Sequence, residues 1–296
     1  MKKITTAVIA AAGNSTRFLP AAKNIPKQIL PLVDVPIIHE IVKECVDSGI
    51  ENVVIVTRPG DNQIEDYFGN NYELEEYLKS TNKMDRYERF NEVYDRVNIA
   101  YVKQSAKLPY GNATPALAAK PFLSGNDPFA YFYADDVVLS DVPAIKQVMD
   151  KYQSMDGKVG CVLATKEVEK SRLSKLSSID FYEMEDMRIR DVIEKPEQGE
   201  EYSNYTIFGR FVLDYRIFDY LADKYVRNGE LWLTDAVVKL AKEMSVYGCN
   251  IDGEWLTTGD PMNYLKTWIA YALKRDDMRD ELKKYIDSYC ACGKLE

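Results

Sequence analysis

The sequence predicts an α/β protein with a Rossmann-like, doubly wound sheet that is mostly parallel but mixed. Short apolar runs rich in β-branched residues recur along the 296-residue chain and have the length of buried strands, as in NVVIVT at 52–57. Segments with helical apolar periodicity separate several of these runs, and the opening order is strand, loop, helix, strand. The length allows one large domain or two modest ones, and we expect a single domain over residues 1–296.

The first predicted strand and the loop behind it carry the clearest functional pattern. Ala7 to Ala10 form a short apolar run that stops at small residues, and polar residues that turn the backbone follow. Arg17, Lys23 and Lys27 come next, with prolines between them. The backbone N–H groups of such a loop can surround phosphates while the cations neutralise them. The pattern therefore predicts a polyphosphate site.

Two common phosphate motifs do not explain this loop. It matches neither the P-loop G-x-x-x-x-G-K-[ST] nor the dinucleotide motif G-x-G-x-x-G. A plain surface loop with solvated cations remains an alternative for any single lysine. The convergence of a strand end, small residues and three cations favours the polyphosphate site.

The remaining elements follow from the same periodicities. A helical stripe over 36–49 closes at its glycine. Further strands are predicted at 97–102, from Phe129 up to Asp135 and Asp136, and at 159–164, 187–196, 204–213 and 246–251. Further helices are predicted at 143–152, at 236–243 with Thr234 or Asp235 as the cap, and over 262–288. Residues 61–95 are polar and rich in tyrosine, and we expect an insertion or a lid there.

An acidic pair ends the most apolar of these runs. Within residues 129–139, an aromatic strand that begins at Phe129 leads directly into Asp135 and Asp136. Active sites of open α/β sheets lie at the carboxyl ends of the strands, and hard cations prefer carboxylate oxygens. The pair therefore predicts a Mg²⁺ ligand, with Asp136 turned to the other face by strand alternation. Two solvated turn aspartates are the alternative.

Composition excludes several classes of function. A net charge of −9 argues against nucleic-acid binding, so the cations must be concentrated locally. The five cysteines, at 45, 161, 249, 290 and 292, form no regular disulfide framework, and we expect a reducing cytoplasm. No stretch approaches the roughly 20 apolar residues that cross a bilayer, so we expect no membrane partner.

The run GNSTRFLPAAKNIPKQILP, from Gly13 to Pro31, resembles the signature of the sugar-1-phosphate nucleotidyltransferases, usually G-x-G-T-R-(x)n-K-x-x-P-K. Its spacing is most similar to that of the bacterial enzymes that act on UTP and glucose 1-phosphate. Ser15 stands where the family has its second glycine. The resemblance implies a fold of the nucleotide-diphospho-sugar transferase type, with a sugar-binding region at about 155–235 and C-terminal helices at about 261–288. It implies nucleotide contacts from Ala11, Ala12, Gly13, Asn14, Ser15 and Thr16.

The segment after the predicted strand 97–102 resembles the part of the family that reads the base. Gln104 suits uracil, because its amide can donate to a carbonyl and accept from the ring N–H at once. Gly111 would let the ring lie against the backbone. Pro109 and Asn112 replace a glycine and a histidine of the family's G-x-G-H-A loop. An ordinary turn with a surface glutamine is the alternative.

Three later segments resemble the family's acceptor site. Glu194 and Lys195 match its E-K-P motif: the glutamate can accept from sugar hydroxyls and the lysine can meet the sugar phosphate. Ser177 takes the place of a glycine in a segment whose backbone contacts the sugar. Gly209 lies in a run similar to the family's N-x-x-x-x-G-R-Y-V-L and indicates a close backbone approach.

The metal site departs from the family pattern. Asp135 corresponds to the family's metal-binding aspartate, but Thr257 occupies the position of its second aspartate. Asp260 or water can complete the Mg²⁺ shell, or the nucleotide phosphates can. Asp260 also precedes Pro261 as a good helix N-cap, so a structural role is equally open.

The resemblance implies transfer of a uridylyl group from UTP to glucose 1-phosphate, giving UDP-glucose and pyrophosphate. Arg17 is then expected at the leaving pyrophosphate and Lys27 at the phosphates near the reacting centre. Lys195 is expected to hold the acceptor phosphate and Asp135 the Mg²⁺. We also expect a homo-oligomer, a dimer or a tetramer.

Three alternatives stay open. Ser177 and the altered loop at Pro109 and Asn112 permit another sugar 1-phosphate or dTTP. Cytidylyl transfer to a phosphorylated alcohol would leave Glu194 without a hydroxyl-rich ligand. A nucleotide-binding regulator that has lost the chemistry is the third, supported by Thr257.

Overall fold

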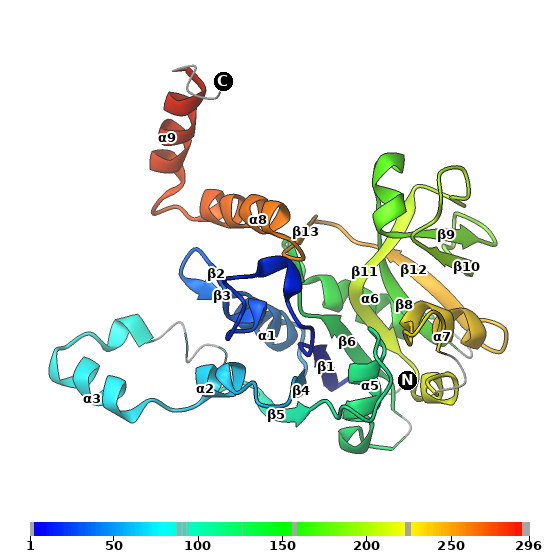
Figure 1. Cartoon of the computed structure of the whole chain (residues 1–296), viewed down its shortest axis with the longest axis horizontal. Coiled ribbons are helices and arrows are strands. Elements are labelled where there is room, and N and C mark those ends of the chain that lie inside the picture. Colours follow the sequence, from blue (N-terminus) through cyan, green and yellow to red (C-terminus); the bar gives the residue numbers. More distant parts are fainter. Residues whose placement is uncertain are drawn as a thin grey trace.

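The computed structural model describes residues 3–87, 90, 93, 95–125, 127–155, 159–222 and 226–291. For residues 290 and 291 it describes the backbone alone. In this part of the chain a seven-stranded sheet has the order β12-β8-β11-β6-β1-β4-β5 (Figure 1). Its strands are β1 Thr6–Ala10, β4 Asn52–Thr57, β5 Asn98–Lys103, β6 Phe129–Tyr133, β8 Val159–Glu167, β11 Tyr205–Leu213 and β12 Ser245–Asn250. Among the described strands of this sheet only β11 runs against its neighbours. The predicted mixed, mostly parallel sheet is confirmed.

Helices cover both faces of the sheet. The helices of the described chain are α1 Ile37–Asp47, α2 Gln63–Phe68, α3 Tyr72–Ser80, α5 Thr114–Ala119, α6 Ala144–Ser154, α7 Leu233–Leu240, α8 Pro261–Lys274 and α9 Arg279–Ala291. Along β1, Ala7 and Ile9 pack into one apolar cluster and Val8 into the other. Burial on both faces explains why this strand is apolar throughout instead of alternating.

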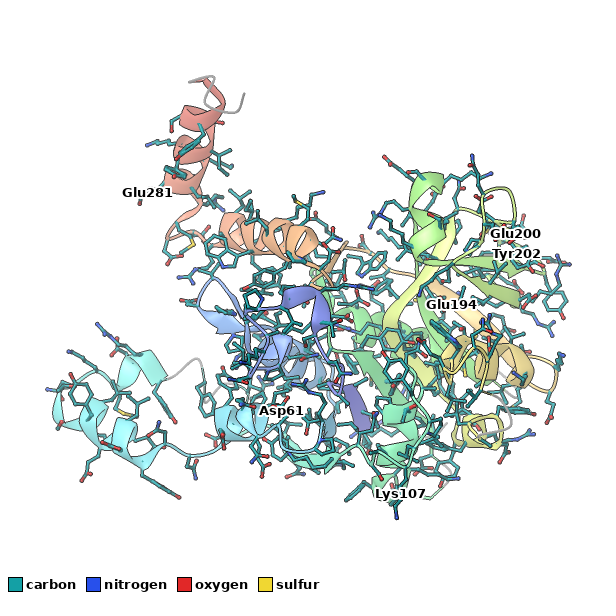
Figure 2. The ribbon with its side chains drawn as sticks, viewed as in Figure 1. Asp61, Lys107, Glu194, Glu200, Tyr202 and Glu281 are labelled. Atoms are coloured by element: carbon teal, nitrogen blue, oxygen red, sulfur yellow. The ribbon has the colours of Figure 1, made fainter. Side chains whose placement is uncertain are left out.

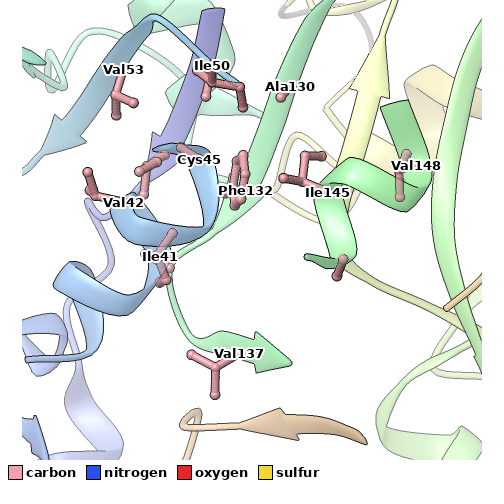
Figure 3. Packing of buried hydrophobic residues seen from close by; sticks show 14 of the residues in the cluster. Ile41, Val42, Cys45, Ile50, Val53, Ala130, Phe132, Val137, Ile145 and Val148 are labelled. Atoms are coloured by element: carbon pink, nitrogen blue, oxygen red, sulfur yellow. The ribbon is translucent and has the colours of Figure 1, made fainter. Parts of the chain in front are cut away.

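The cluster under α1 shows why that segment folds as a helix. Ile41, Val42 and Cys45 lie on one helical stripe and are fully buried. They pack with Phe132 of β6 and with Ile145 of α6 (Figure 3). Gly49, with a φ of +80°, takes the left-handed conformation that ends the helix.

The stretch 129–139 folds as predicted up to Tyr133, where β6 ends just before Asp135 and Asp136. Ala134 still donates to the Ala10 carbonyl of β1, but the chain then turns out of the sheet at Asp135. The second half, β7 Asp136–Leu139, pairs antiparallel with β13 Glu254–Thr257.

Other boundaries also differ from prediction. The strand predicted at 187–196 is β10 Ile189–Glu194, which pairs with β9 Ser177–Phe181 outside the main sheet. The helix predicted at 236–243 begins at Leu233, and neither Thr234 nor Asp235 caps it. The helical region predicted over 262–288 contains two helices, and α9 extends away from the sheet beyond α8 (Figure 1).

Part of the segment predicted as an insertion or a lid, residues 61–95, belongs to the core. Ile64 and Phe68 of α2, together with Val93, join the core cluster under α1. The following α3 reaches out to the side of the molecule (Figure 1). Short turns and strands complete the described chain: η1 Thr16–Phe18, η2 Lys27–Ile29, β2 Pro31–Leu32, β3 Val35–Pro36, η3 Met84–Tyr87, η4 Lys120–Phe122, η5 Lys170–Lys175 and η6 Tyr215–Tyr220.

The cysteines agree with the absence of a disulfide framework in the described chain. Cys45, Cys161 and Cys249 are buried and unpaired. Of the remaining two, Cys292 lies outside the described residues, and the side chain of Cys290 is not described. None of the helices in the described ranges is both long and apolar enough to span a membrane.

Candidate active site

The candidate site lies at the carboxyl ends of the parallel strands β1, β4, β5 and β6. The loop after β1 begins at Ala11, whose N–H donates to the Val56 carbonyl of β4. Asp135 follows β6, and Gln104 follows β5. Because these strands run in the same direction, their following loops meet at one edge of the sheet.

The loop after β1 presents its backbone to solvent. Gly13, Asn14 and Thr16 are exposed, and the side of Gly13 where a Cβ would stand is open. Ser15 has a φ of +54°, in the left-handed region that favours glycine. Its Oγ accepts from the Lys27 N–H at 3.3 Å and so ties the start of the loop to its end. This conformation is the physical reason for a glycine at this position in the family pattern.

Lys27 and Asp135 form an ion pair in the loop's mouth, with 2.6 Å between Nζ and Oδ2. The lysine side chain is 12% exposed and the carboxylate 35% exposed. Burial acts to raise the pKa of Asp135, but the charge and hydrogen bond of Lys27 outweigh it and hold that pKa below its ordinary value. The pair is therefore charged and only partly open to solvent.

A strand from far along the chain completes this group. The Asp135 carbonyl accepts from the Thr258 N–H at 2.6 Å, and the Thr257 and Thr258 hydroxyls also donate to it. Arg17 Nη1 donates to the Gly259 carbonyl at 3.4 Å. Thr257, in the place of the family's second aspartate, therefore supports the backbone at Asp135. Apart from the unusual Thr-Thr pair, no sequence pattern indicates this contact.

Asp136 points into the protein, as alternation predicted. Its two oxygens accept from the Gly209 N–H at 2.9 Å and from the Trp255 indole N–H at 2.8 Å. Burial raises the pKa of Asp136 to about 6, and the charge of Asp135 adds to the effect. A Cβ at Gly209 would stand 2.5 Å from the Tyr133 Cβ. The close approach predicted at Gly209 is thus to Asp136 and Tyr133, beneath the site.

A buried arginine anchors the same turn from below. Arg210 donates to the Asp136 carbonyl at 2.8 Å and forms an ion pair with Glu44 of α1 at 2.7 Å. Glu44 also accepts from the N–H of Ile145 at the start of α6. Fully buried charges are stable only when paired and hydrogen-bonded in this way. Sequence reasoning missed Glu44, Arg210 and Trp255.

The two residues predicted to read the base differ in their surroundings. Gln104 continues the β5 ladder through its N–H, and its Oε1 is buried without a hydrogen-bond partner among the described residues. A buried, unpartnered acceptor suits a ligand N–H. Gly111, by contrast, has its open side filled: a Cβ there would stand 2.2 Å from the Leu231 carbonyl oxygen. Its glycine is required by Leu231, not by open space for a ring.

The predicted acceptor residues lie at the end of β10. Glu194 lies where β10 meets α7 (Figure 2), and burial raises its pKa, opposed chiefly by the Thr234 hydroxyl and the Lys195 charge. Lys195 is exposed, with a φ of +49°. Ser177 is 3% exposed, and its hydroxyl bonds Thr206 and the Ile207 N–H, so it joins β9 to β11.

The structure gathers the predicted residues into two groups. Arg17, Lys27 and Asp135 form the first group, and Glu194 and Lys195 the second. Tyr133, at the end of β6, has its pKa raised well above the ordinary value by burial first, and then by charges that include Glu194 and Asp135. Its ring therefore lies within electrostatic range of both groups.

Asp260 acts as a helix cap in the structure. Its side chain accepts from the Asn263 N–H at 3.0 Å at the start of α8, as the structural alternative expected. Among the described residues no group of three or more His, Cys, Asp or Glu side chains is placed to hold a metal. A separate cavity of about 800 Å³ beside β5 is lined by none of the predicted site residues.

The sheet order and the loop facing the carboxylate after β6 define the fold of the nucleotide-diphospho-sugar transferases. A model of the nucleotidyl transferase family matches residues 6–272, and the chain belongs to that family. It is 42% identical to a UTP–glucose-1-phosphate uridylyltransferase of Staphylococcus epidermidis over 97% of this chain and 98% of that protein.

Solved structures agree with that assignment. A UTP-bound UGPase from Acinetobacter baumannii superposes with a TM-score of 0.86 at 29% identity, covering 96% of this chain and 99% of that one. A UDP-glucose pyrophosphorylase complexed with UDP-glucose superposes with a TM-score of 0.82 at 31% identity, covering 92% of this chain and all of the other. The fold expected from the resemblance is confirmed.

Proposed function

We propose that this protein transfers the uridylyl group of UTP to glucose 1-phosphate, producing UDP-glucose and pyrophosphate. The observation that carries the proposal is the Lys27–Asp135 pair facing the exposed backbone of the Gly13–Thr16 loop at the sheet edge. Relatives named for this activity, and solved relatives with UTP or UDP-glucose bound, support the choice of substrates.

The proposed step needs no nucleophile from the protein. A phosphate oxygen of glucose 1-phosphate attacks the α-phosphorus of UTP in line, the new O–P bond forms, and the bond to the bridging oxygen of pyrophosphate breaks. The developing charge requires nearby cations, and we assign Lys27 to the phosphates near the reacting centre and Arg17 to the leaving pyrophosphate. The contributions of the chain are positioning and charge neutralisation.

Mg²⁺ fits Asp135 as the proposed ion. The carboxylate supplies the oxygen donors that this ion prefers, and its lowered pKa keeps it ionised. The described residues offer few further ligands, so nucleotide phosphate oxygens and water would complete the shell. When bound, the ion neutralises phosphate charge. Asp260 stays a second proposed ligand only if its bond to Asn263 opens.

The second group of residues suits the acceptor. We assign Lys195 to the phosphate of glucose 1-phosphate and Glu194 to the sugar hydroxyls. Ser177 and Gly209 support the sugar-binding region at 155–235 through their hydrogen bonds to Ile207 and Asp136. Gln104 is assigned to the uracil, because its buried acceptor oxygen has no described partner.

The test is pyrophosphate release from UTP, measured with and without Mg²⁺ across a panel of sugar 1-phosphates and with dTTP in parallel. Release that requires glucose 1-phosphate and Mg²⁺ is expected. Release with another sugar or with dTTP would keep the chemistry and change the substrate. Tight UTP binding without release from any pair would favour a regulator instead.

We also propose a homo-oligomer in a reducing cytoplasm. The exposed tyrosines of α9, Tyr285 and Tyr289, support self-association, since this helix extends away from the sheet (Figure 1). The buried, unpaired Cys45, Cys161 and Cys249 fit a reducing compartment.

A further inference from the structure

We propose that Trp232 positions the Lys195 ammonium for the acceptor phosphate and so sets the affinity for the sugar 1-phosphate. This inference rests on the proposed function, because Lys195 is assigned there to that phosphate. Trp232 precedes α7 and comes from a segment that no sequence motif had singled out for a ligand role.

The contact is a cation over an aromatic face. Lys195 Nζ lies 5.2 Å from the centroid of the Trp232 ring, within the range of a cation–π interaction. In the described part of the chain the ammonium forms no ion pair with a carboxylate. An indole face attracts the positive charge without using the N–H donors of the Lys195 ammonium, so these donors stay available to a phosphate.

A contact that positions the ammonium affects binding because the Lys195 side chain is otherwise exposed to solvent. Its backbone is fixed by a left-handed φ of +49° and by the bond from its N–H to the Leu176 carbonyl at 2.6 Å. The exposed side chain has four rotatable torsions, and ordering them on binding costs entropy. A ring that already holds the ammonium reduces that cost.

The segment that carries Trp232 is held in place by packing and by hydrogen bonds of its neighbours. Its neighbours Leu231 and Leu233 are buried in the apolar cluster, while the indole is only half-buried. The Leu231 N–H donates to the Tyr110 carbonyl at 2.7 Å, and the Leu233 N–H donates to Asn112 Oδ1 at 2.8 Å. The ring's position is therefore fixed by the segment that carries the proposed base-reading loop.

The experiment compares Trp232→Leu, which removes the aromatic face, with Trp232→Phe, which keeps one. We expect Trp232→Leu to raise the KM for glucose 1-phosphate about twofold to thirtyfold, the range of a cation–π contact. The KM for UTP and kcat should change little, and Trp232→Phe should restore most of the loss. In a Lys195→Met background Trp232→Leu should have no further effect, since the cation is already gone.

Three results would overturn the inference: an unchanged KM for glucose 1-phosphate, equal losses in the Leu and Phe variants, or an undiminished effect beside Lys195→Met. Thermal unfolding of each variant separates a folding defect, and Trp232→Gln replaces Trp232→Leu if the latter does not fold. Turnover by the unsubstituted enzyme tests the proposed function separately. If it uses another sugar 1-phosphate, that substrate takes the place of glucose 1-phosphate; if it uses none, both proposals fail.

Discussion

At Ser15 the backbone is left-handed at a residue with a Cβ, which costs free energy that glycine would not. Ser15→Gly and Ser15→Ala both lose the bond from the Lys27 N–H to Oγ, so they differ only in this backbone term. We expect the glycine variant to be the more stable of the two by about 1 kcal/mol in urea unfolding. Equal stabilities would contradict the left-handed conformation.

The cations of the two groups should affect different kinetic constants. We expect Arg17→Ala to lower kcat about 100-fold, because the charge it neutralises develops in the transition state. Lys195→Ala should chiefly raise the KM for glucose 1-phosphate, because it removes binding of the acceptor. Arg86 is exposed in η3, outside both groups, and Arg86→Ala is the matched control, expected near wild type. Steady-state kinetics with each substrate varied in turn measure these effects, and near-normal kinetics for Arg17→Ala would contradict its role.

The raised pKa of Glu194 predicts the acid limb of the pH profile. Burial raises this pKa, the Lys195 charge opposes the rise, and the carboxylate must be ionised to accept from sugar hydroxyls. Activity is therefore lost as the pH falls through the folded-state pKa. Lys195→Met removes that charge, so we expect the acid limb of kcat/KM for glucose 1-phosphate to move to higher pH.

The control for that shift is Lys242→Met, the same change at an exposed lysine just after α7. It should leave the acid limb in place. A limb that stays fixed in Lys195→Met, or that moves to lower pH, would show that Glu194 does not control it.

At the scale of elements, a side chain from the base-reading loop caps α7. Asn112 Oδ1 accepts from the Leu233 N–H, one of the otherwise unpaired donors at the start of that helix. We expect Asn112→Ala to lower the free energy of unfolding by about 1 kcal/mol, the usual cost of a lost N-cap. Asn112→Asp keeps an acceptor and should retain most of the stability in urea unfolding. An aspartate variant as unstable as the alanine variant would argue against the cap.

At the scale of the whole molecule, we propose α9 as the contact between copies of the chain in the homo-oligomer. Helices of this length are marginal alone in water, and its stripe of Leu282, Tyr285, Ile286 and Tyr289 includes two tyrosines about half exposed. We expect light scattering to give a multiple of the chain mass for the full protein and the single-chain mass after removal of residues 279–296. The same assembly in both proteins would exclude α9 from the interface.

The sequence by itself determined the sheet class and the first functional group. Strand runs of buried length, separated by helical stripes, require a doubly wound sheet, and parallel strands bring their following loops to one edge. For that reason Lys27 and Asp135, far apart in the chain, could be expected near one another, and the structure joins them in an ion pair.

Only the tertiary structure decided which partners surround those residues. The contacts of Trp255 with Asp136, of Asn112 with Leu233 and of Trp232 with Lys195 join distant segments. Each could be made by several residue types at either end, so no local pattern specifies it. The pairing of β7 with β13 was hidden for the same reason, because the residues of β7 do not by themselves indicate a partner strand. Local propensity sets the elements, whereas packing sets their partners.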